Sequence, residues 1–486
     1  MRRFVQKGNI KNNNGMKFYS TNNPPSPEAS AGKKINLVDF KTALLAGLAP
    51  DNGLFMPEKF PKLSGKFFEE IGNKKFWEIA VDIGKKFIGD IPRHDLEEIV
   101  KEAFDFEILI KDLGENLYVL ELFHGPTLAF KDFGARFMAR VMNYYLKQGK
   151  KNLNIIVATS GDTGSAVAQG FYGLSNVKVF ILYPSKRITE LQEKQMATLG
   201  KNIVAIEVGG SFDDCQKLAK QILSDGELKK KFNFTSANSI NFGRLLPQSF
   251  YYLWGYAQMK KIGIKEFVYC VPSGNFGNLT AGLMAKRMGM NVSRFIAATN
   301  ANDVFPRYLE TGKFVSRVSR ETISNAMDVG NPSNFARLLD MYGNNVKQAE
   351  GPEYSRRAEG PEYSRRAEGP EYSRGMADDV VGISITDNET RETIKNVYRE
   401  TNYICDPHTA VGVTAGRKSN VSQPIVVLGT AHPAKFREIV EPLIGKKVVL
   451  PPQLTAVLEK PKKSFVLENN FEKLRKVITD FAIGNS

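Results

Sequence analysis

The stretch Glu266-Phe-Val-Tyr-Cys-Val-Pro-Ser-Gly-Asn-Phe-Gly-Asn-Leu-Thr280 combines an apolar run, a loop with two glycines and the start of an amphipathic segment. The apolar run predicts a strand over Glu266–Val271, and the following segment predicts a helix over Leu279–Met288. Glycines allow the backbone to turn sharply between two such elements. A strand followed by a loop and a helix is the repeating unit of α/β folds.

The same alternation of short apolar runs and longer amphipathic segments continues on both sides of this unit. Strands that are buried on both faces and separated by helices predict parallel sheets of the doubly wound α/β kind. Such sheets bind ligands beyond the carboxyl ends of their strands. The other predicted strands are Asn154–Thr159, Val177–Tyr183, Ile203–Val208, Arg294–Thr299, Val380–Ile385 and Pro424–Leu428. The other predicted helices are Ser165–Tyr172, Thr189–Leu199, Phe212–Leu223, Gly243–Lys260, Glu389–Arg399 and Ala434–Val440.

The composition is that of a globular protein with room for two or three domains. The chain has 486 residues, 42% of them hydrophobic and 24% charged, and no apolar run approaches the roughly 20 residues of a membrane span. The net charge of +15 suits an anionic ligand, but the lysines are spread along the chain instead of forming one block with aromatic residues. We therefore expect neither nucleic acid nor a membrane as a partner, and a cytoplasmic location.

The cysteines indicate neither a metal site nor a disulfide framework. Cys215, Cys270 and Cys405 lie far apart, without a Cys-x-x-Cys pair. This usage fits a reducing compartment. No metal is expected.

The chain divides into segments of different character. Residues 1–15 contain basic but no acidic residues, which is compatible with either a targeting extension or a disordered tail. Residues 16–105 are expected to form a small mixed N-terminal domain, and 106–445 the main α/β region. Residues 446–486 are expected to be a C-terminal extension.

One segment of the main region lacks the α/β alternation. Glu350-Gly-Pro-Glu-Tyr-Ser-Arg-Arg-Ala358 recurs at 359–367 and, truncated, at 368–374. A unit this short and polar cannot form a core of its own. Residues 349–375 are therefore predicted to be a disordered surface insertion without a catalytic role.

Two of the loops that follow strands are suited to binding anions. In Gly274–Asn278, glycines allow successive backbone N–H groups to point inward at a helix start, where the helix dipole favours negative charge. The loop lacks both the Walker A ending and the dinucleotide fingerprint spacing, so the single phosphate of a small cofactor suits it. The turn Thr159-Ser-Gly-Asp-Thr-Gly-Ser165 is suited to a carboxylate. On their own, both loops are also compatible with simple tight turns.

Lys131 is the candidate for covalent chemistry. It lies in Phe123-His-Gly-Pro-Thr-Leu-Ala-Phe-Lys-Asp-Phe-Gly134, between apolar residues. Loss of solvent lowers the pKa of a lysine and frees a nucleophilic amine for Schiff-base chemistry. The competing interpretation of this stretch alone is a lysine whose stem packs while its ammonium reaches water.

Further polar residues follow a third strand. Thr430 and His432 lie in Gly429-Thr-Ala-His-Pro433, at the expected carboxyl edge of the sheet. Thr430 is equally compatible with a helix N-cap. Neither His432 nor His124 is assigned a catalytic role.

Two polar clusters lie between apolar elements: Asn238-Ser-Ile-Asn241 with Arg244, and Ser324-Asn-Ala-Met-Asp328. Arg244, near a predicted helix start, is suited to binding a phosphate with two hydrogen bonds. The alternative is a solvated arginine.

Taken together, five motifs in this order resemble those of the threonine synthase family, which are pyridoxal-phosphate enzymes with the tryptophan synthase β fold. The motifs are Leu128-Ala-Phe-Lys-Asp-Phe133, Ser160-Gly-Asp-Thr-Gly164, Ser273-Gly-Asn-Phe-Gly-Asn278, Ser324-Asn-Ala-Met-Asp328 and Leu428-Gly-Thr-Ala-His-Pro433. The resemblance extends from Met16 to the C-terminal region, apart from the repeat. It implies a two-lobed fold of PLP type II, with the site between the lobes, and the conversion of O-phospho-L-homoserine and water to L-threonine and phosphate.

The resemblance also implies a role for each motif residue. Lys131 binds the cofactor aldehyde and, once released, moves protons. Thr430 pairs with the pyridine nitrogen. The residues implied to hold the cofactor phosphate are Gly274, Asn275, Phe276, Gly277 and Asn278. The residues implied to bind the substrate are Ser160, Gly161 and Thr163 for its carboxylate, and Asn238, Ser239 and Arg244 for its phosphate.

Asp162 departs from the pattern of related enzymes, which often have an asparagine here that contacts the oxygen of the cofactor ring. Asp162 is therefore expected to act near the cofactor through its backbone or through another partner.

Two other functions remain open at this stage. An enzyme of the same fold could release phosphate, ammonia and 2-oxobutyrate instead of threonine. A non-catalytic basic scaffold would use the charge or the repeat to bind partners. The sequence does not decide between a monomer and a homodimer.

Overall fold

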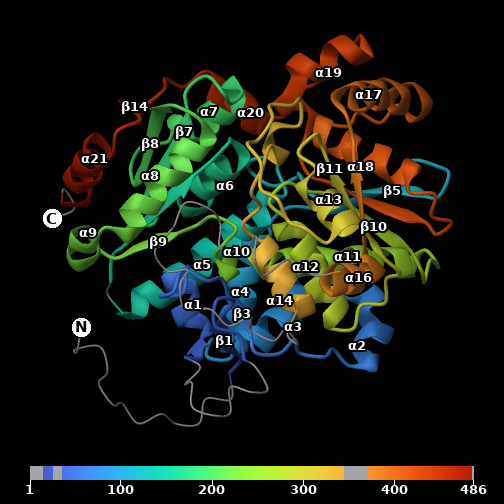
Figure 1. Ribbon diagram of the computed structural model, residues 1–486, viewed down its shortest axis with the longest axis horizontal. Coiled ribbons are helices and arrows are strands. Elements are labelled where there is room, and N and C mark those ends of the chain that lie inside the picture. Colours follow the sequence, from blue (N-terminus) through green and yellow to red (C-terminus); the bar gives the residue numbers. More distant parts are fainter. Residues whose placement is uncertain (1–14, 26–35, 150, 344–369, 484–486) are drawn as a thin grey trace.

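The computed structural model describes residues 15–25, 36–149, 151–343 and 370–483. Within these ranges the chain forms two mainly parallel sheets, each flanked by helices, and a small antiparallel sheet near the N-terminus (Figure 1). The predicted α/β class with two lobes and a small N-terminal domain is confirmed.

The larger sheet has the strand order β12-β11-β10-β13-β5-β4. Its neighbours pair in parallel except for β4, which runs antiparallel to β5. Every residue of β10, β11 and β13 is buried, as expected where helices cover both faces of a sheet. The strands are β4 Leu109–Asp112, β5 Leu117–Glu121, β10 Val268–Pro272, β11 Phe295–Thr299, β12 Val380–Ser384 and β13 Ile425–Gly429.

The smaller lobe contains the sheet β14-β8-β7-β6-β9, in which all pairs are parallel. Its last strand comes from the predicted C-terminal extension, which is thus an integral part of the lobe. The strands are β6 Leu153–Ala158, β7 Val177–Pro184, β8 Ile203–Gly209, β9 Phe234–Ser236 and β14 Ser464–Glu468.

Helices pack against both sheets. Helix α18 contacts β10, β11 and β13, whereas α8 contacts β6 and β7. The helices of the smaller lobe and the C-terminus are α6 Asp162–Phe171, α7 Glu190–Ala197, α8 Phe212–Ser224, α9 Gly226–Lys231, α20 Pro452–Leu458 and α21 Phe471–Ile483. The others are α5 Lys131–Gly149, α10 Phe242–Leu245, α11 Gln248–Lys261, α12 Gly277–Arg287, α13 Val304–Thr311, η3 Asn325–Met327, α14 Phe335–Gly343, α16 Pro370–Asp379, α17 Asp387–Thr401, α18 Pro407–Lys418, η4 Pro433–Phe436 and α19 Arg437–Ile444.

The N-terminal elements form the blue base of the molecule in Figure 1 and support α5 and α11. Edge-to-face contacts of Phe18 with Phe40 and Phe242 join this base to α10. Its elements are β1 Lys17–Ser20, β2 Val38–Asp39, α1 Phe40–Ala46, β3 Phe55–Pro57, α2 Gly65–Glu70, η2 Ile71–Asn73, α3 Phe76–Phe87 and α4 Arg93–Ala103.

All seven predicted strands are confirmed to within two residues, but two predicted helices are wrong. Ala434–Val440 spans the 3-10 helix η4, which ends at Phe436, and α19, which begins at Arg437. The segment Gly243–Lys260 is not continuous, because α10 ends at Leu245 and α11 begins at Gln248. Pro247 precedes α11, and a proline lacks the N–H that a continuous helix would need at this point.

Most of the predicted repeat insertion, residues 349–375, lies outside the described residues. Its end does not, because α16 begins at Pro370 and so includes the last residues of the third copy. Residues 370–375 of the segment that was predicted to be disordered are therefore helical. Residues 1–14, almost all of the predicted basic extension, also lie outside the described part of the chain.

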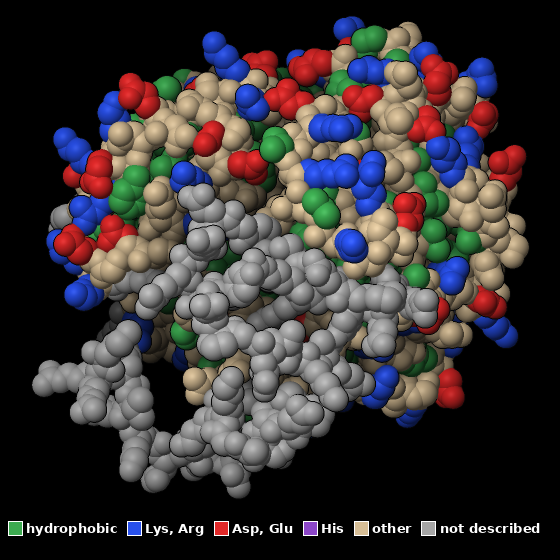
Figure 2. Space-filling model, viewed as in Figure 1, with side chains coloured by type: hydrophobic (Ala, Val, Ile, Leu, Met, Phe, Trp, Pro, Cys, Tyr) green, Lys and Arg blue, Asp and Glu red, His purple; other side chains and the backbone are tan. Residues whose placement is uncertain are grey.

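On the face shown in Figure 2, Lys and Arg side chains are interspersed with Asp and Glu side chains. In the described ranges, no helix has the length and apolar character needed to cross a membrane.

Candidate active site

A cavity of about 170 Å³ lies where the carboxyl ends of β6, β10 and β13 face one another across the two lobes. All predicted site residues except Gly161 line it. The predicted residues in its wall are Lys131, Ser160, Asp162, Thr163, Asn238, Ser239, Arg244, Gly274, Asn275, Phe276, Gly277, Asn278 and Thr430.

Lys131 is the first residue of α5, and 15% of its side chain is exposed. Burial lowers its pKa to about 8, an effect that Asp162 opposes and that Lys435 and Arg244 reinforce. Lys131 therefore carries an uncharged amine in about a tenth of the molecules at pH 7, far more than an ordinary lysine does. The amine can act as a nucleophile and as a proton acceptor.

The loop after β10 is held in shape by its own side chains. The Asn278 side chain accepts a hydrogen bond from the Ser273 hydroxyl at 2.6 Å and donates to the Pro272 carbonyl at 2.8 Å. Phe276 has a left-handed φ of 56° and directly precedes α12. In the first turn of α12 the Leu279 N–H donates to the Asn278 side chain at 3.0 Å, whereas the N–H groups of Gly277 and Asn278 are suited to an anion.

Gly274 lies against the backbone of η3. A Cβ atom at this position would be 2.6 Å from the Met327 Cα atom and 2.9 Å from its carbonyl oxygen. Only glycine allows this approach without displacing one of the two backbones.

The turn after β6 leads directly into α6, three residues earlier than predicted. The Thr159 hydroxyl oxygen accepts hydrogen bonds from the N–H groups of Gly161 and Gly164, at 3.0 and 2.8 Å. Gly161 has a φ of 131°, and a Cβ there would meet the Gln192 side chain at 2.5 Å. Gly161 thus shapes the turn without lining the cavity, while Ser160 and Thr163 do line it.

Asp162 has a partner that the sequence analysis missed. Its Oδ1 atom is 2.7 Å from the Nζ atom of Lys435 and accepts a hydrogen bond from the Gln192 amide at 3.0 Å. Burial alone would raise the pKa of Asp162, but Lys435 and Lys131 outweigh it and lower the pKa below its usual value. Lys435 follows the Gly429–Pro433 motif closely in the sequence, and that proximity was the available signal.

Arg244 is buried and lies beside the cavity. One guanidinium nitrogen donates to the Ala237 carbonyl at 2.5 Å. Its Nε atom is buried without a hydrogen-bond partner among the residues that the structure describes. Burial lowers the pKa of Arg244 to about 10, while Asp132 opposes the shift. A buried, charged group with an unused donor is suited to binding an anion.

Asn238, Ser239 and Asn275 connect the loops around the cavity. The Asn238 amide donates to the Ala158 carbonyl at 2.8 Å, and the Asn275 amide donates to the Ser239 hydroxyl at 2.7 Å. These side chains thus link the loops at the ends of β6, β9 and β10. Their predicted role in binding the substrate phosphate stays a prediction.

Thr430 follows β13 and is buried at the cavity wall, and its carbonyl oxygen accepts a hydrogen bond from the Phe130 N–H at 2.9 Å. His432 instead caps η4, and burial lowers its pKa to about 4. His408, which the sequence analysis did not select, also lines the cavity. Its Nδ1 atom is 2.6 Å from the Asp406 carboxylate, and its Nε2 atom accepts from the Ala326 N–H at 3.1 Å.

The residues in the cavity fit pyridoxal phosphate. Lys131 supplies an amine for an aldehyde, the loop 274–278 supplies N–H groups for a phosphate, and Thr430 supplies a hydroxyl for a ring nitrogen. The close approach of Gly274 to Met327 shows that this loop requires a residue without a side chain.

Comparison with known proteins gives an independent assignment. The family model described as "Pyridoxal-phosphate dependent enzyme" matches residues 101–358. Two further models match, "Threonine synthase N terminus" at residues 29–104 and "Threonine synthase, C-terminal" at residues 409–478.

Individual relatives agree with these models. The chain is 42% identical to the threonine synthase of Escherichia coli over 443 residues, which covers 91% of this chain and 96% of the relative. It is 38% identical to the threonine synthase of Schizosaccharomyces pombe over 441 residues, or 82% of this chain and 86% of the relative.

Solved structures show the same fold. The crystal structure of threonine synthase from Escherichia coli matches with a TM-score of 0.83 and 40% identity, covering 96% of this chain and all of that one. PLP-bound threonine synthase from Brucella melitensis matches with a TM-score of 0.84 and 34% identity, covering 96% of this chain and 99% of that one. The chain therefore belongs to the threonine synthase family of pyridoxal-phosphate-dependent enzymes.

Proposed function

We propose that this enzyme converts O-phospho-L-homoserine and water to L-threonine and phosphate in the cavity around Lys131. The observation that carries the proposal is that a buried amine shares one cavity with a buried arginine and with two turns that are suited to binding anions. A substrate with a carboxylate at one end and a phosphate at the other, bound beside a phosphate-bearing cofactor, uses all of these groups.

The cofactor site is formed by residues from both lobes. When bound, pyridoxal phosphate withdraws electrons from the carbon atoms of an amino acid joined to it. In this proposal the loop 274–278 binds its phosphate through backbone N–H groups, and Thr430 hydrogen-bonds its ring nitrogen. Lys131 would hold its aldehyde group.

Lys131 then moves the protons of the reaction. Its Nζ atom accepts the proton from the α-carbon of the substrate, because its lowered pKa leaves the amine uncharged in part of the molecules. The same atom accepts and donates the further protons of the reaction, in which phosphate leaves the γ-carbon and water adds at the β-carbon. Ser160 and Thr163 hold the substrate carboxylate, so that the α-carbon stays within reach of the amine.

The matches to the N-terminal and C-terminal threonine synthase models favour the synthase over the alternative lyase. The non-catalytic scaffold is wrong, because the chain belongs to a family of enzymes.

The direct test is to incubate the cofactor-loaded enzyme with O-phospho-L-homoserine and to quantify threonine, phosphate, ammonia and 2-oxobutyrate. Threonine and phosphate are expected in equal amounts. Ammonia and 2-oxobutyrate in place of threonine would identify the lyase instead.

Arg244→Ala is expected to raise the KM for O-phospho-L-homoserine by about 10- to 100-fold, because a hydrogen bond to a charged group contributes about 1.5–3 kcal/mol. Steady-state kinetics on the purified variant measure the change. Arg187→Ala is the matched control, since Arg187 is exposed and pairs with Glu321. An unchanged KM in Arg244→Ala would remove Arg244 from the substrate site.

We also propose a cytoplasmic enzyme that is a monomer or a homodimer. Its three cysteines are free and buried, which suits a reducing compartment. Light scattering on the purified protein distinguishes the two oligomeric states, and cell fractionation tests the location.

A further inference from the structure

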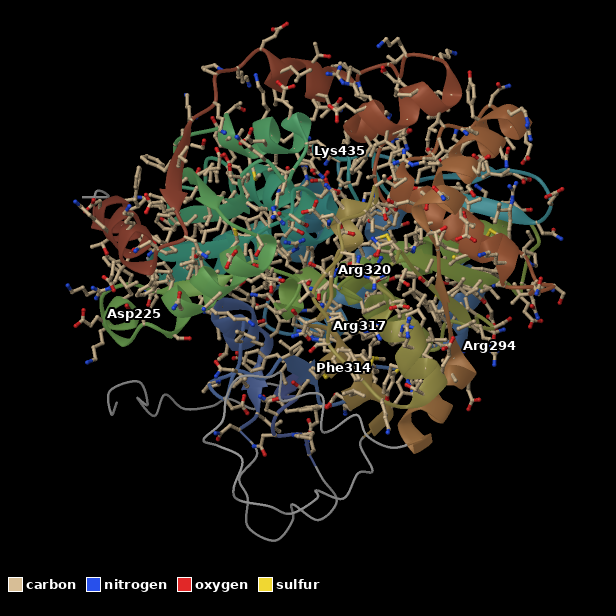
Figure 3. All side chains as sticks on the ribbon, turned by 45° about the horizontal axis from the view of Figure 1, so that its top comes forward. Asp225, Arg294, Phe314, Arg317, Arg320 and Lys435 are labelled. Atoms are coloured by element: carbon tan, nitrogen blue, oxygen red, sulfur yellow. The ribbon has the colours of Figure 1, made fainter. Side chains whose placement is uncertain are left out.

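A second buried amine, that of Lys435, contacts Asp162 of the cavity wall. The side chain of Lys435, labelled in Figure 3, is fully buried in η4. Its Nζ atom is 2.7 Å from Asp162 Oδ1 and donates to the Thr127 carbonyl at 2.9 Å. A lysine is rarely this deeply buried unless its charge is paired.

Asp162 lies between the two amines but is bonded to only one of them. Its Oδ1 atom accepts hydrogen bonds from both the Lys435 ammonium and the Gln192 amide. Its Oδ2 atom is 3.9 Å from the Nζ atom of Lys131, which is beyond hydrogen-bonding distance. The carboxylate is thus hydrogen-bonded to Lys435, and its ion pair with Lys131 is longer by more than 1 Å.

We propose that Lys435 is a positioning residue for the reaction, because it holds the Asp162 carboxylate away from Lys131 and so keeps the Lys131 amine free to take up a proton. The proposal rests on the proposed function of the site. It assigns Lys435 no contact with the substrate.

The other charged groups around Lys131 either disfavour its ammonium form, as Lys435 does, or are hydrogen-bonded to other residues. Arg244 of α10 adds a second positive charge that disfavours the ammonium form. Asp132, the next residue of α5, accepts hydrogen bonds from the N–H and hydroxyl of Thr127, and burial raises its pKa to about 6. Lys131 is therefore influenced by two positively charged side chains, Lys435 and Arg244, and by one carboxylate, Asp162, which is hydrogen-bonded to Lys435.

Two further groups act on these carboxyls and not directly on Lys131. Arg136, also on α5, favours the charged form of Asp132. His408 of α18 favours the charged form of Asp162, where it adds to the larger effect of Lys435. Neither group provides an alternative partner for the Lys131 amine.

The arrangement predicts that the pKa of Lys131 changes in opposite directions when Lys435 is removed and when the Asp162 carboxylate is removed. Without Lys435, the Asp162 carboxylate is free to pair with Lys131, and the pKa of Lys131 rises. Without the carboxylate, only cations face Lys131, and its pKa falls. The free amine is the form present above the pKa. Loss of Lys435 should therefore shift the onset of amine reactivity to higher pH, and loss of the Asp162 carboxylate should shift it to lower pH.

The test compares Lys435→Met, Asp162→Asn and the double variant in the full-length enzyme. The first readout is the pH midpoint of the visible absorbance of the cofactor bound to Lys131. The second is the pH dependence of Lys131 labelling by an amine-reactive reagent after cofactor removal, followed by peptide mass spectrometry. We expect midpoints about one pH unit higher in Lys435→Met and about one unit lower in Asp162→Asn, with the double variant between them.

Two comparisons separate positioning from a merely structural role. Lys435→Arg keeps the charge and is expected to retain a midpoint close to that of the unmodified enzyme. Lys147→Met removes an exposed charge from the far end of α5 and should leave the midpoint unchanged. If a single variant does not fold, the double variant still tests the proposal, because it leaves neither a buried carboxylate nor a buried ammonium unpaired.

Midpoints that stay fixed, or that move in the same direction in both single variants, would overturn the proposal. The absorbance and labelling readouts need no substrate. An enzyme that forms no threonine would therefore contradict the proposed function without affecting this test.

Discussion

Lys131→Ala is expected to lower threonine formation by about 10³- to 10⁴-fold, because it removes the only amine that this mechanism uses for proton transfer. The variant should also lose covalent attachment of the cofactor, since no nitrogen remains for its aldehyde. Phosphate release from O-phospho-L-homoserine, followed with time, measures the rate. Mass spectrometry after borohydride reduction measures the attachment.

Lys147→Ala is a matched control, because Lys147 lies on the same helix but is exposed in its last turn. This variant should retain full activity and cofactor attachment. Threonine formation by Lys131→Ala at more than about a tenth of the normal rate would assign proton transfer to another residue.

Gly274→Ala is expected to weaken cofactor binding by about 10- to 100-fold. The new methyl group would lie 2.6 Å from the Met327 Cα atom, so the loop or η3 must move. Either movement turns backbone N–H groups away from the cofactor phosphate, and hydrogen bonds to a charged group contribute about 1.5–3 kcal/mol. Titration of the cofactor-free enzyme with pyridoxal phosphate, followed by absorbance, gives the affinity.

The suitable control for Gly274→Ala is Gly226→Ala, at the start of α9, where a Cβ would meet nothing within 4 Å. The control should bind the cofactor normally. Activity of Gly274→Ala should recover at high cofactor concentration, since Lys131 is intact. A variant with normal affinity would exclude the loop 274–278 as the phosphate site.

The fold could largely be predicted because its central strands are buried on both faces. Apolar runs such as those of β7 and β10 stand out in the sequence without knowledge of their neighbours. Strand β14 lies at an edge, where each of its five residues is partly or fully exposed, and it does not stand out in the sequence as a buried apolar run. Its place at the edge of the sheet is set by pairing with β8, which no local pattern reveals.

The candidate site could be predicted in part, for a related reason. Lys131 and the glycine loops carry their signal in short motifs, and the cavity brings them together as expected. Lys435 carries no such signal, because its importance comes from contact with Asp162, which lies far away in the sequence. His408 was missed for the same reason, since its partner Ala326 belongs to another element.

The C-terminal strand β14 and helix α21 affect the order in which the molecule can be assembled. Leu474 and Ile478 of α21 complete the same apolar cluster as Cys215 of α8, and β14 covers the edge of β8. During synthesis on a ribosome β14 and α21 emerge long after β6 and the turn that follows it. The smaller lobe must therefore remain incomplete, with the edge of β8 open, until β14 and α21 have left the ribosome.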